Sequence, residues 1–310
     1  MSASPEQAPR GNAPLVNAPL VNAMSVDVED YFQVQAFAGC IDRADWDGFA
    51  PRVADNTHRI LDQFARHGVK ATFFTLGWVA ERQGALIRAI VAGGHELASH
   101  GYEHIRADAQ DPPSFRADIA RARAILEDTG GVAVRGYRAA TFSIGARNLW
   151  AFAELEATGH AYSSSINPIR HDLYGMPDAP RAPFRPDGTA LWELPMTTVR
   201  LGGRNLPCAG GGFFRLLPYR LFRAGLRRMH RADGMRAMFY FHPWEVDPGQ
   251  PRIAGCGAKA RFRHYTGLAA MAPRLDRLLD DFAWDRIDRV FSDLPGIGPG
   301  ARDAARNGAG

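Results

Sequence analysis

The 310-residue chain has little of what marks several classes of protein. It contains only three cysteines, Cys40, Cys208 and Cys256, which are far apart and show no Cys-x-x-Cys spacing. Neither a disulfide framework nor a thiolate zinc site is therefore expected, and a reducing compartment is the simpler interpretation. No apolar run is long enough to cross a bilayer, so no transmembrane segment is expected.

Basic residues are in slight excess, with a net charge of +4, but they form no stripe interleaved with aromatic residues. This pattern argues against nucleic acid as a partner. The first residues also lack the basic and apolar stretches of a signal peptide, which favours the cytoplasm. With 46% apolar and 23% charged residues, the composition is typical of a globular protein with one large α/β domain.

The two ends of the chain differ in composition from the part between them. Residues 1–23 contain prolines and a repeated Ala-Pro-Leu-Val-Asn segment, and we expect them to be a disordered extension. Met24 directly precedes a strand-like run and is a candidate translation start. Residues 293–310 are rich in Gly, Ala and Arg, and we expect a flexible tail there. One folded domain over residues 24–292 is therefore expected.

Within that domain, strand-like and helix-like runs alternate. The expected strands cover residues 24–28, 69–76, 95–98, 134–138, 161–166, 191–199, 236–242 and 286–291. The expected helices cover residues 57–67, 86–91, 114–128 with Ser114 as the cap, 148–158, 218–230 and 267–282. This alternation predicts a parallel sheet with covering helices, and seven or eight strands are enough to close a barrel. Reactive groups gather at the carboxyl ends of the strands in such barrels.

Three carboxylates, Asp27, Glu29 and Asp30, lie where the first strand ends. Asp27 and Glu29 point to the same side of a strand, and Asp30 joins them if the chain turns. Like charges this close repel unless a cation or a proton separates them. The segment therefore indicates a metal site or a catalytic pair, and a solvated turn is the alternative.

A second segment contains His100 and His104, spaced i, i+4. One turn of helix would place both imidazoles on one face, where they would hold a single divalent ion such as zinc. Arg138 follows the fourth strand and would bind a carboxylate, although a structural ion pair is the default for such an arginine. His242 ends an apolar strand beside Trp244 and would act as a general acid, unless it is a satisfied core histidine.

In this order the segments resemble the polysaccharide deacetylase family, also described by NodB homology or as like carbohydrate esterase family 4. The resemblance is closest to the branch associated with exopolysaccharide loci and exosortase systems. It extends to the stretches Ser-Val-Asp-Val-Glu-Asp-Tyr-Phe-Gln-Val, Gly-Gly-Gly-Phe-Phe-Arg-Leu-Leu-Pro-Tyr and Phe-Arg-His-Tyr at residues 25–34, 210–219 and 262–265, and covers residues 24–292. It implies an α/β fold with a single distorted (β/α) barrel of about seven strands.

The resemblance also implies a divalent ion, expected to be zinc with cobalt or nickel as alternatives, held by one acidic residue and two histidines. The metal ligands would be His100 and His104 with Glu29, and Asp30 is the rival acidic ligand. Asp27 would be the catalytic base, oriented by Arg138, and His242 would be the general acid.

The sequence departs from the family pattern in three places. The first motif reads Asp-Val-Glu-Asp instead of two adjacent aspartates, and residues 138–142 read Arg-Ala-Ala-Thr-Phe instead of Arg-Pro-Pro-Tyr. An aspartate that often precedes the serine pair is absent from residues 162–165, Tyr-Ser-Ser-Ser. These changes bear on substrate contacts more than on the reaction class.

The implied reaction is hydrolysis of N-acetyl groups from amino-sugar residues of a polysaccharide or its precursor, with release of acetate. The implied partners are an N-acetylated glycan and a polysaccharide synthesis complex. A ring-amide hydrolase of the allantoinase or imidase kind is an alternative on the same fold. The other alternative is a degenerate, non-catalytic glycan-binding protein.

Overall fold

The computed structural model describes residues 20–299 of the chain. Its strands are β1 (Val21–Val28), β2 (Thr72–Thr75), β3 (Glu96–Ser99), β4 (Gly136–Tyr137), β5 (Tyr162–Ser163), β6 (Trp192–Glu193), β7 (Thr198–Leu201), β8 (Arg204–Pro207), β9 (Met238–Phe241) and β10 (Ala283–Asp285). Its α-helices are α1 (Val53–His67), α2 (Gly77–Arg82), α3 (Gly84–Ala92), α4 (Pro112–Gly130), α5 (Ala151–Ala157), α6 (Gly211–Leu216), α7 (Tyr219–Asp233), α8 (Ala258–Tyr265), α9 (Leu268–Asp281) and α10 (Ile287–Val290). Five short 3₁₀ helices are η1 (Gln35–Phe37), η2 (Arg43–Gly48), η3 (Ala107–Ala109), η4 (Ala140–Phe142) and η5 (Pro243–Val246).

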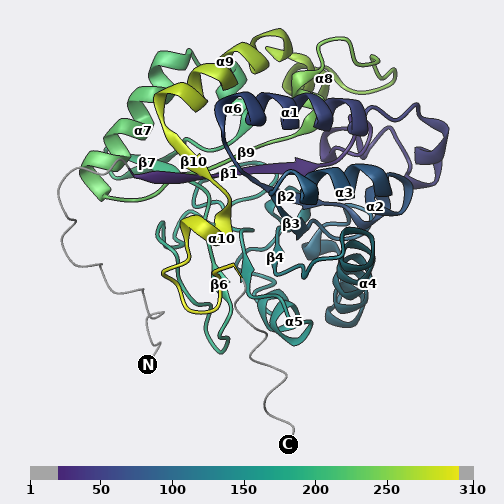
Figure 1. The fold of residues 1–310 in the computed structure, drawn as a ribbon, viewed down its shortest axis with the longest axis horizontal. Coiled ribbons are helices and arrows are strands. Elements are labelled where there is room, and N and C mark those ends of the chain that lie inside the picture. The colour runs from purple at the N-terminus through teal and green to yellow at the C-terminus, as the bar shows by residue number, and fades with distance from the viewer. Residues whose placement is uncertain (1–19, 300–310) are drawn as a thin grey trace, which may run out of the picture.

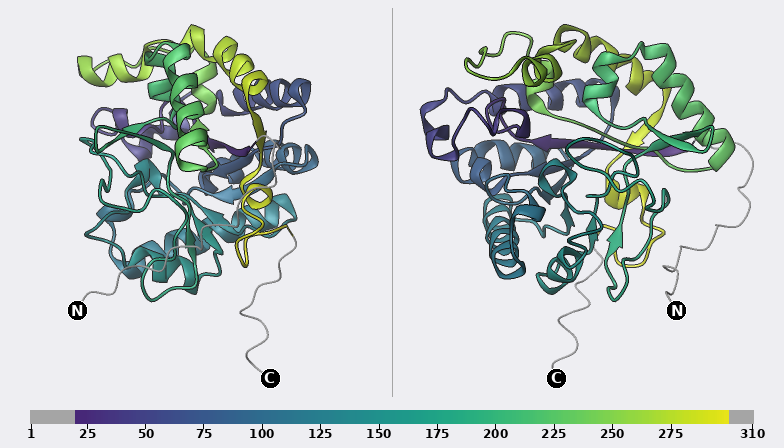
Figure 2. Two further views of the ribbon diagram at one scale, coloured as in Figure 1. Left: turned by 90° about the vertical axis from the view of Figure 1, so that its left-hand side faces the viewer. Right: turned by 180° about the vertical axis from the view of Figure 1, so that it is seen from behind.

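A curled parallel sheet organises the molecule. Its strands follow the order β10-β1-β2-β3-β4-β5-β6, and β9 pairs with the other edge of β1. Helices α1, α6, α7 and α9 lie on one side of the curl and α4 and α5 on the opposite side, as both the front and rear views show (Figures 1 and 2). This arrangement confirms the predicted α/β class and the single distorted (β/α) barrel.

The barrel is not closed by direct pairing of β6 with β9. Instead the segment between them returns along β9, where the Tyr240 N–H donates to the carbonyl of Ala209 and Gly210 forms a bridge to Tyr240. We call this region between β6 and β9 the seam. The antiparallel hairpin of β7 and β8 leaves the sheet there. The seam is therefore built by an irregular segment, and it differs from the regular strand–helix alternation of β1 to β4.

Local signals fix the ends of the two long helices on the β1–β4 side. Gly68 caps the C-terminus of α1 and Gly131 that of α4, both in the left-handed conformation that glycine adopts without strain. Helix α4 is capped by Asp111, whose carboxylate accepts from the backbone N–H of Ser114. The prediction that Ser114 itself is the cap was therefore wrong, because Pro112 suits the first turn of a helix and moves its start forward.

The predicted ends of the domain need correction where they fall on described residues. Strand β1 begins at Val21, and the side chain of Asn22 bonds the backbone of Ala237 and Ala283. Residues 21–23 are thus part of the sheet, and a chain starting at Met24 would lack these bonds. At the other end Leu294 and Ile297 are buried, so residues 293–297 pack against the domain. Residues 1–19 and 300–310 lie outside the described part.

The last predicted strand, over residues 286–291, was also wrong. The strand there is β10, and the residues that follow it form the short helix α10, in which Ile287 and Val290 are buried. The pattern of apolar and charged residues in Ile287–Val290 fits a strand as well as a helix. The residues that pair with β1 as a strand are instead Ala283–Asp285.

The expectation of no disulfide was wrong as well. Cys40, after η1, and Cys256, before α8, form a disulfide with a Cα–Cα distance of 5.6 Å, and Cys208 is a buried free thiol. The bonded cysteines are 216 positions apart, so their spacing could not reveal the pairing. Among the described helices, none is long and apolar enough to span a membrane.

Candidate active site

The carboxyl end of β1 delivers the first group of polar side chains into the interior. Asp27 and Glu29 are both about 2% exposed, although each is ionisable. Strand β1 is buried along nearly its whole length because β2 and β9 flank it. Burying two carboxylates this deeply is costly unless charged partners surround them, and the structure supplies such partners from β3, β4 and β9.

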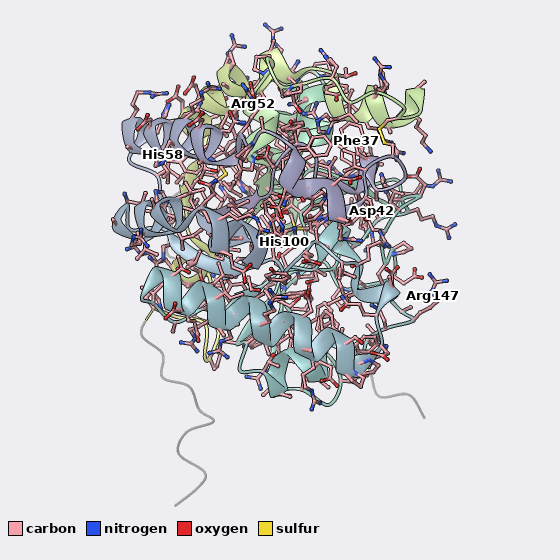
Figure 3. The ribbon with its side chains drawn as sticks, turned by 90° about the vertical axis from the view of Figure 1, so that its right-hand side faces the viewer. Phe37, Asp42, Arg52, His58, His100 and Arg147 are labelled. Carbon is pink, nitrogen blue, oxygen red and sulfur yellow. A yellow bond between two sulfur atoms is a disulfide. The ribbon has the colours of Figure 1, made fainter. Side chains whose placement is uncertain are left out.

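The two histidines predicted as ligands lie with Glu29 in one cluster. Single ligand atoms of Glu29, His100 and His104 all lie within 4.8 Å of one another, and Nε2 of His104 is 3.0 Å from Oε2 of Glu29. Nδ1 of His100 lies 2.8 Å from the carbonyl oxygen of Arg138 and donates to it, which leaves Nε2 free to accept. His100 lies near the centre of the molecule, whereas Arg147 is at its periphery (Figure 3).

The histidine pair is not on a helix, so that part of the prediction was wrong. Strand β3 ends at Ser99, and Gly101 and His104 take positive φ angles of 78° and 54° in the loop that follows. The carboxylate of Asp118 accepts from the backbone N–H of Tyr102 and holds this loop. The i, i+4 spacing therefore brings the imidazoles together through a tight loop rather than through one helical turn.

The cluster fits a divalent metal ion by the chemistry of its donors. Burial lowers the pKa of His100 to about 4 and the pKa of His104 well below its usual value, so both imidazoles are neutral ligands. Burial raises the pKa of Glu29 to about 7, and its Oε2 atom is buried without a hydrogen-bond donor. A cation between the three side chains would satisfy this oxygen.

Asp30, the rival acidic ligand, lies apart from this cluster. Its carboxylate accepts from the backbone N–H groups of Arg52 and Val53, at 2.7 and 2.9 Å, and from that of Tyr31. Arg52 is the N-cap of α1 and offers no capping side chain, so Asp30 caps this helix from a distant part of the chain. Of the two acidic residues, only Glu29 is positioned beside the histidines.

Arg138 and Asp27 form the ion pair that the sequence suggested. Nη1 of Arg138 donates to Oδ1 of Asp27 at 2.6 Å and to Oγ of Ser25 at 2.9 Å. The guanidinium is completely buried and lies over the ring of Phe74 at 4.1 Å. Its other N–H groups donate to Ser164 at the end of β5. These contacts hold the Asp27 carboxylate in place beside the cluster.

His242 approaches the same carboxylates from the end of β9. Its Nε2 atom is 3.6 Å from Oε1 of Glu29 and 4.0 Å from Oδ2 of Asp27, and its Nδ1 is 2.7 Å from Oε1 of Glu245. Burial disfavours the charged imidazole, but the hydrogen bond that its Nδ1 donates to Glu245 and the nearby carboxylates outweigh burial and raise the pKa of His242 to about 9. His242 is therefore a proton donor at neutral pH.

Sequence reasoning missed Glu245 and Arg215, which stand behind His242. Nε of Arg215 donates to Oε2 of Glu245 at 2.6 Å. Burial raises the pKa of Glu245, but Arg215 and His242 together outweigh this effect and lower the pKa to about 2. A Cβ atom at Gly211 would overlap the Glu245 carboxylate, which explains a glycine there. The i, i+3 spacing of His242 and Glu245 was the available signal, because such pairs face each other at a helix start.

An aromatic stack supports the same side of the site. The rings of His242 and Trp244 are stacked at 5.1 Å, and Trp244 is stacked on His264 at 4.1 Å. Trp244 Nε1 also donates to Oε1 of Glu29 at 3.3 Å. His264 belongs to the Phe-Arg-His-Tyr stretch singled out in the sequence, and Phe37 covers its other side. Through Trp244, the stack connects His242 to Glu29 and to His264.

Two family matches divide the chain at the middle of the barrel. Residues 45–160 match the family described as polysaccharide deacetylase, and residues 164–292 match a domain family of unknown function, DUF3473. The first match contains His100, His104 and Arg138, whereas His242 lies in the second. Asp27 and Glu29 precede both.

Characterised relatives match the first of these regions over short stretches. A peptidoglycan-N-acetylglucosamine deacetylase of Bacillus cereus is 34% identical over 82 residues, which is 26% of this chain and 30% of that protein. A chitooligosaccharide deacetylase of Sinorhizobium fredii is 48% identical over 48 residues, or 16% of this chain and 22% of that protein. The chain thus matches less than a third of the length of these relatives.

Similarity of fold extends over nearly the whole chain. A Mycobacterium smegmatis protein, whose crystal structure is described as that of a candidate polysaccharide deacetylase, superposes with a TM-score of 0.62 at 20% identity. The superposition covers 93% of this chain and 95% of that one. The shared fold therefore includes the half of the barrel whose domain family has no assigned function.

Proposed function

We propose that this chain, which carries a domain of the polysaccharide deacetylase family, is a metal-dependent hydrolase that removes N-acetyl groups from amino sugars. The observation that carries the proposal is the convergence of Glu29, His100 and His104 beside Asp27 and His242. The relatives named above act on peptidoglycan N-acetylglucosamine and on chitooligosaccharide, which supports the same class of substrate for this chain.

Glu29, His100 and His104 would hold the ion, and zinc suits two neutral imidazoles and one carboxylate, with cobalt or nickel as substitutes. Such an ion polarises a carbonyl group and promotes ionisation of water near neutral pH. Asp30 is not among the proposed ligands because its carboxylate caps α1.

The remaining side chains have distinct roles in the proposed reaction. Asp27, held in place by the hydrogen bond from Arg138, accepts a proton from the attacking water as the water oxygen bonds to the acetamide carbonyl carbon. The carbon–nitrogen bond then breaks, and His242 donates a proton through Nε2 to the departing amine. Glu245 and Arg215 hold Nδ1 of His242 and so keep Nε2 directed at the site. The products are acetate and a free amino sugar.

The deciding experiment measures acetate release from an N-acetylated chitooligosaccharide by purified protein, before and after chelation and after addition of Zn²⁺, Co²⁺ or Ni²⁺. We expect activity to be lost with the metal and restored by it. The matched variant His104→Ala should lose both the metal, measured by elemental analysis, and the activity. Full activity in chelated, metal-free protein would contradict the proposal.

The two alternatives give different results in the same assay. A ring-amide hydrolase would open allantoin or a cyclic imide and release no acetate from the oligosaccharide. A non-catalytic glycan-binding protein would bind the oligosaccharide without turnover. The buried Asp27–Arg138 pair and the partly buried His242, held by the buried Glu245, favour an enzyme over the latter, because binding alone does not require a base and an acid placed beside one another in the interior.

The exopolysaccharide branch and association with a polysaccharide synthesis complex stay predictions from the sequence motifs. The proposed compartment changes, however. Disulfides persist in oxidising environments, so the Cys40–Cys256 bond favours an oxidising compartment over the cytoplasm expected from the cysteine spacing. A free-thiol count on protein isolated without reductant tests this: one thiol per chain supports the disulfide, and three contradict it.

A further inference from the structure

The seam between β6 and β9 contains a large groove that the reaction described above does not use. Its volume is about 2490 Å³, well above the ~300–1,000 Å³ typical of sites for small ligands. The segment 168–183, the β7–β8 hairpin, α6, the end of α7 and α8 all contribute to its lining. A cavity of this size suits a polymer segment better than a single small molecule.

The charge of the groove is mostly positive. Two of the aspartates lining it are already neutralised, since Arg181 binds Asp233 at 2.7 Å and Arg236 binds Asp293 at 2.6 Å. Lys259 and Arg263, which also line the groove, form ion pairs with Asp172.

Three further arginines in the lining have no such partner. Arg170, Arg200 and Arg204 are exposed, and no ion pair involves them within residues 20–299. Asp178 is the remaining acidic side chain of the lining, so three unpaired cations face one carboxylate. An unpaired cluster of arginines in a concave site attracts anionic ligands and raises their local concentration.

Aromatic side chains connect this groove to the candidate active site. Tyr240 lines the groove, and its ring is 5.7 Å from the ring of His242. Phe142 packs against Tyr240 at 4.8 Å and against Tyr174, another lining residue, at 5.5 Å. Phe213 and the exposed Phe262 line the groove as well, and aromatic faces of this kind pack on the apolar faces of sugar rings. The groove therefore leads from the outer hairpin to the wall of the reaction centre.

We propose that the groove binds a polyanionic glycan chain, with Arg170, Arg200 and Arg204 contacting its acidic groups while an N-acetylated residue of the same chain reaches the active site. This inference rests on the proposed function for the choice of a glycan. The register of the β7–β8 hairpin pairs Arg200 with Asn205 and Leu201 with Arg204, so the two arginines lie on opposite faces of the hairpin. Both nevertheless line the groove, and the hairpin contributes two of its three unpaired cations.

The test compares binding of polygalacturonate, dextran sulfate and neutral dextran by the full chain at physiological ionic strength. We expect both anionic polymers to bind and neutral dextran to bind on the order of tenfold more weakly or not at all. The double variant Arg200→Glu/Arg204→Glu should weaken binding of the anionic polymers by on the order of tenfold. The two polymers distinguish carboxylate from sulfate as the preferred acidic group.

The matched control is Arg147→Glu/Arg220→Glu, which reverses two exposed arginines outside the groove and changes net charge equally. If both double variants weaken binding to the same extent, or if neutral dextran binds as well as polygalacturonate, the proposal is overturned. It is also overturned if an oligonucleotide of equal charge binds more tightly than either glycan. Thermal unfolding of each variant verifies that the hairpin change leaves the domain folded.

Acetate release from a short neutral chitooligosaccharide separates this proposal from the proposed function. That substrate carries no acidic group for Arg200 and Arg204 to bind, so we expect both double variants to retain wild-type rates. Polyanion binding that depends on Arg200 and Arg204 without any acetate release would support the groove and overturn the deacetylase assignment. Acetate release without such binding would support the deacetylase assignment and overturn the proposal for the groove.

Discussion

Two buried arginine–carboxylate pairs, one on each side of the barrel, have nearly the same geometry and different consequences. Arg138 and Asp27 are 2.6 Å apart on the side built by β1 to β5, and Arg215 and Glu245 are 2.6 Å apart on the side built by α6 and β9. Each guanidinium also lies over an aromatic ring, that of Phe74 or of Trp244. In each pair the arginine offsets the cost of burying an ionised carboxylate.

The difference lies in what the carboxylate faces. Asp27 lies beside the cluster of Glu29, His100 and His104 and 4.0 Å from Nε2 of His242, whereas Glu245 contacts Nδ1 of His242 and reaches the cluster through that imidazole. In the proposed reaction, the same kind of ion pair therefore holds the proton acceptor in one region and orients the proton donor in the other. The comparison teaches that one pair of residue types serves different purposes according to what its carboxylate faces.

The strongest way to test this difference is to neutralise each carboxylate without changing its shape. Asp27→Asn should lower kcat by about 10²–10⁴-fold, because it removes the group that accepts the proton. Glu245→Gln should lower kcat by about 10–100-fold, because it loosens the orientation of His242 and leaves the acid in place. Acetate release and metal content measure both. An equal loss in the two variants would mean that Glu245 takes part in the chemistry directly.

A second test removes each arginine and measures stability. Arg138→Met and Arg215→Met should each lower the free energy of unfolding by about 3–5 kcal/mol, because a buried carboxylate is left without its counter-charge. Denaturant unfolding followed by fluorescence measures the change. Adding Glu245→Leu to Arg215→Met should recover part of the loss, since the uncompensated charge then disappears. If Arg215→Met alone were neutral, Glu245 would not depend on that arginine for its burial.

The two pairs were not equally predictable from the sequence. Arg138 directly follows a strand-like run, and Asp27 ends another, so parallel strands bring both to one edge of the sheet. Arg215 lies in a six-residue helix and Glu245 in a 3₁₀ turn, and nothing in their local patterns indicates that they meet. The alternation of strands and helices was predictable because hydrophobic periodicity is local. The irregular seam and its groove depend on contacts between distant loops.

The same reasoning applies to the cluster, whose three side chains lie together although their local structure was predicted incorrectly. The spacing of His100 and His104 indicates two ligands for one ion, but a helix and a tight loop satisfy this spacing equally well. Gly101 decides for the loop, since its φ of 78° is a conformation in which other residues are strained and a Cβ there would contact Asp118. One glycine between two histidines was therefore the overlooked signal.

A third test concerns the disulfide, which joins the loop after η1 to the segment before α8 and thus spans the two regions. Cys40→Ser/Cys256→Ser, or reduction of the wild type, should lower the free energy of unfolding by about 2–5 kcal/mol, because a long loop in the unfolded chain is released. Thermal unfolding with and without reductant measures this. The double serine variant provides the control, as its stability should not respond to reductant.

The smallest expected effect separates the two neighbouring acidic residues at the end of β1. Asp30→Ala should lower stability by about 0.5–2 kcal/mol through loss of the α1 cap, with metal content unchanged. Glu29→Gln should have the opposite profile, with little loss of stability and a protein that no longer retains the metal after dialysis. Both changes remove one negative charge from adjacent positions, so a general electrostatic effect would make them alike. Loss of metal from the Asp30→Ala protein, with retention in Glu29→Gln, would reverse the ligand assignment.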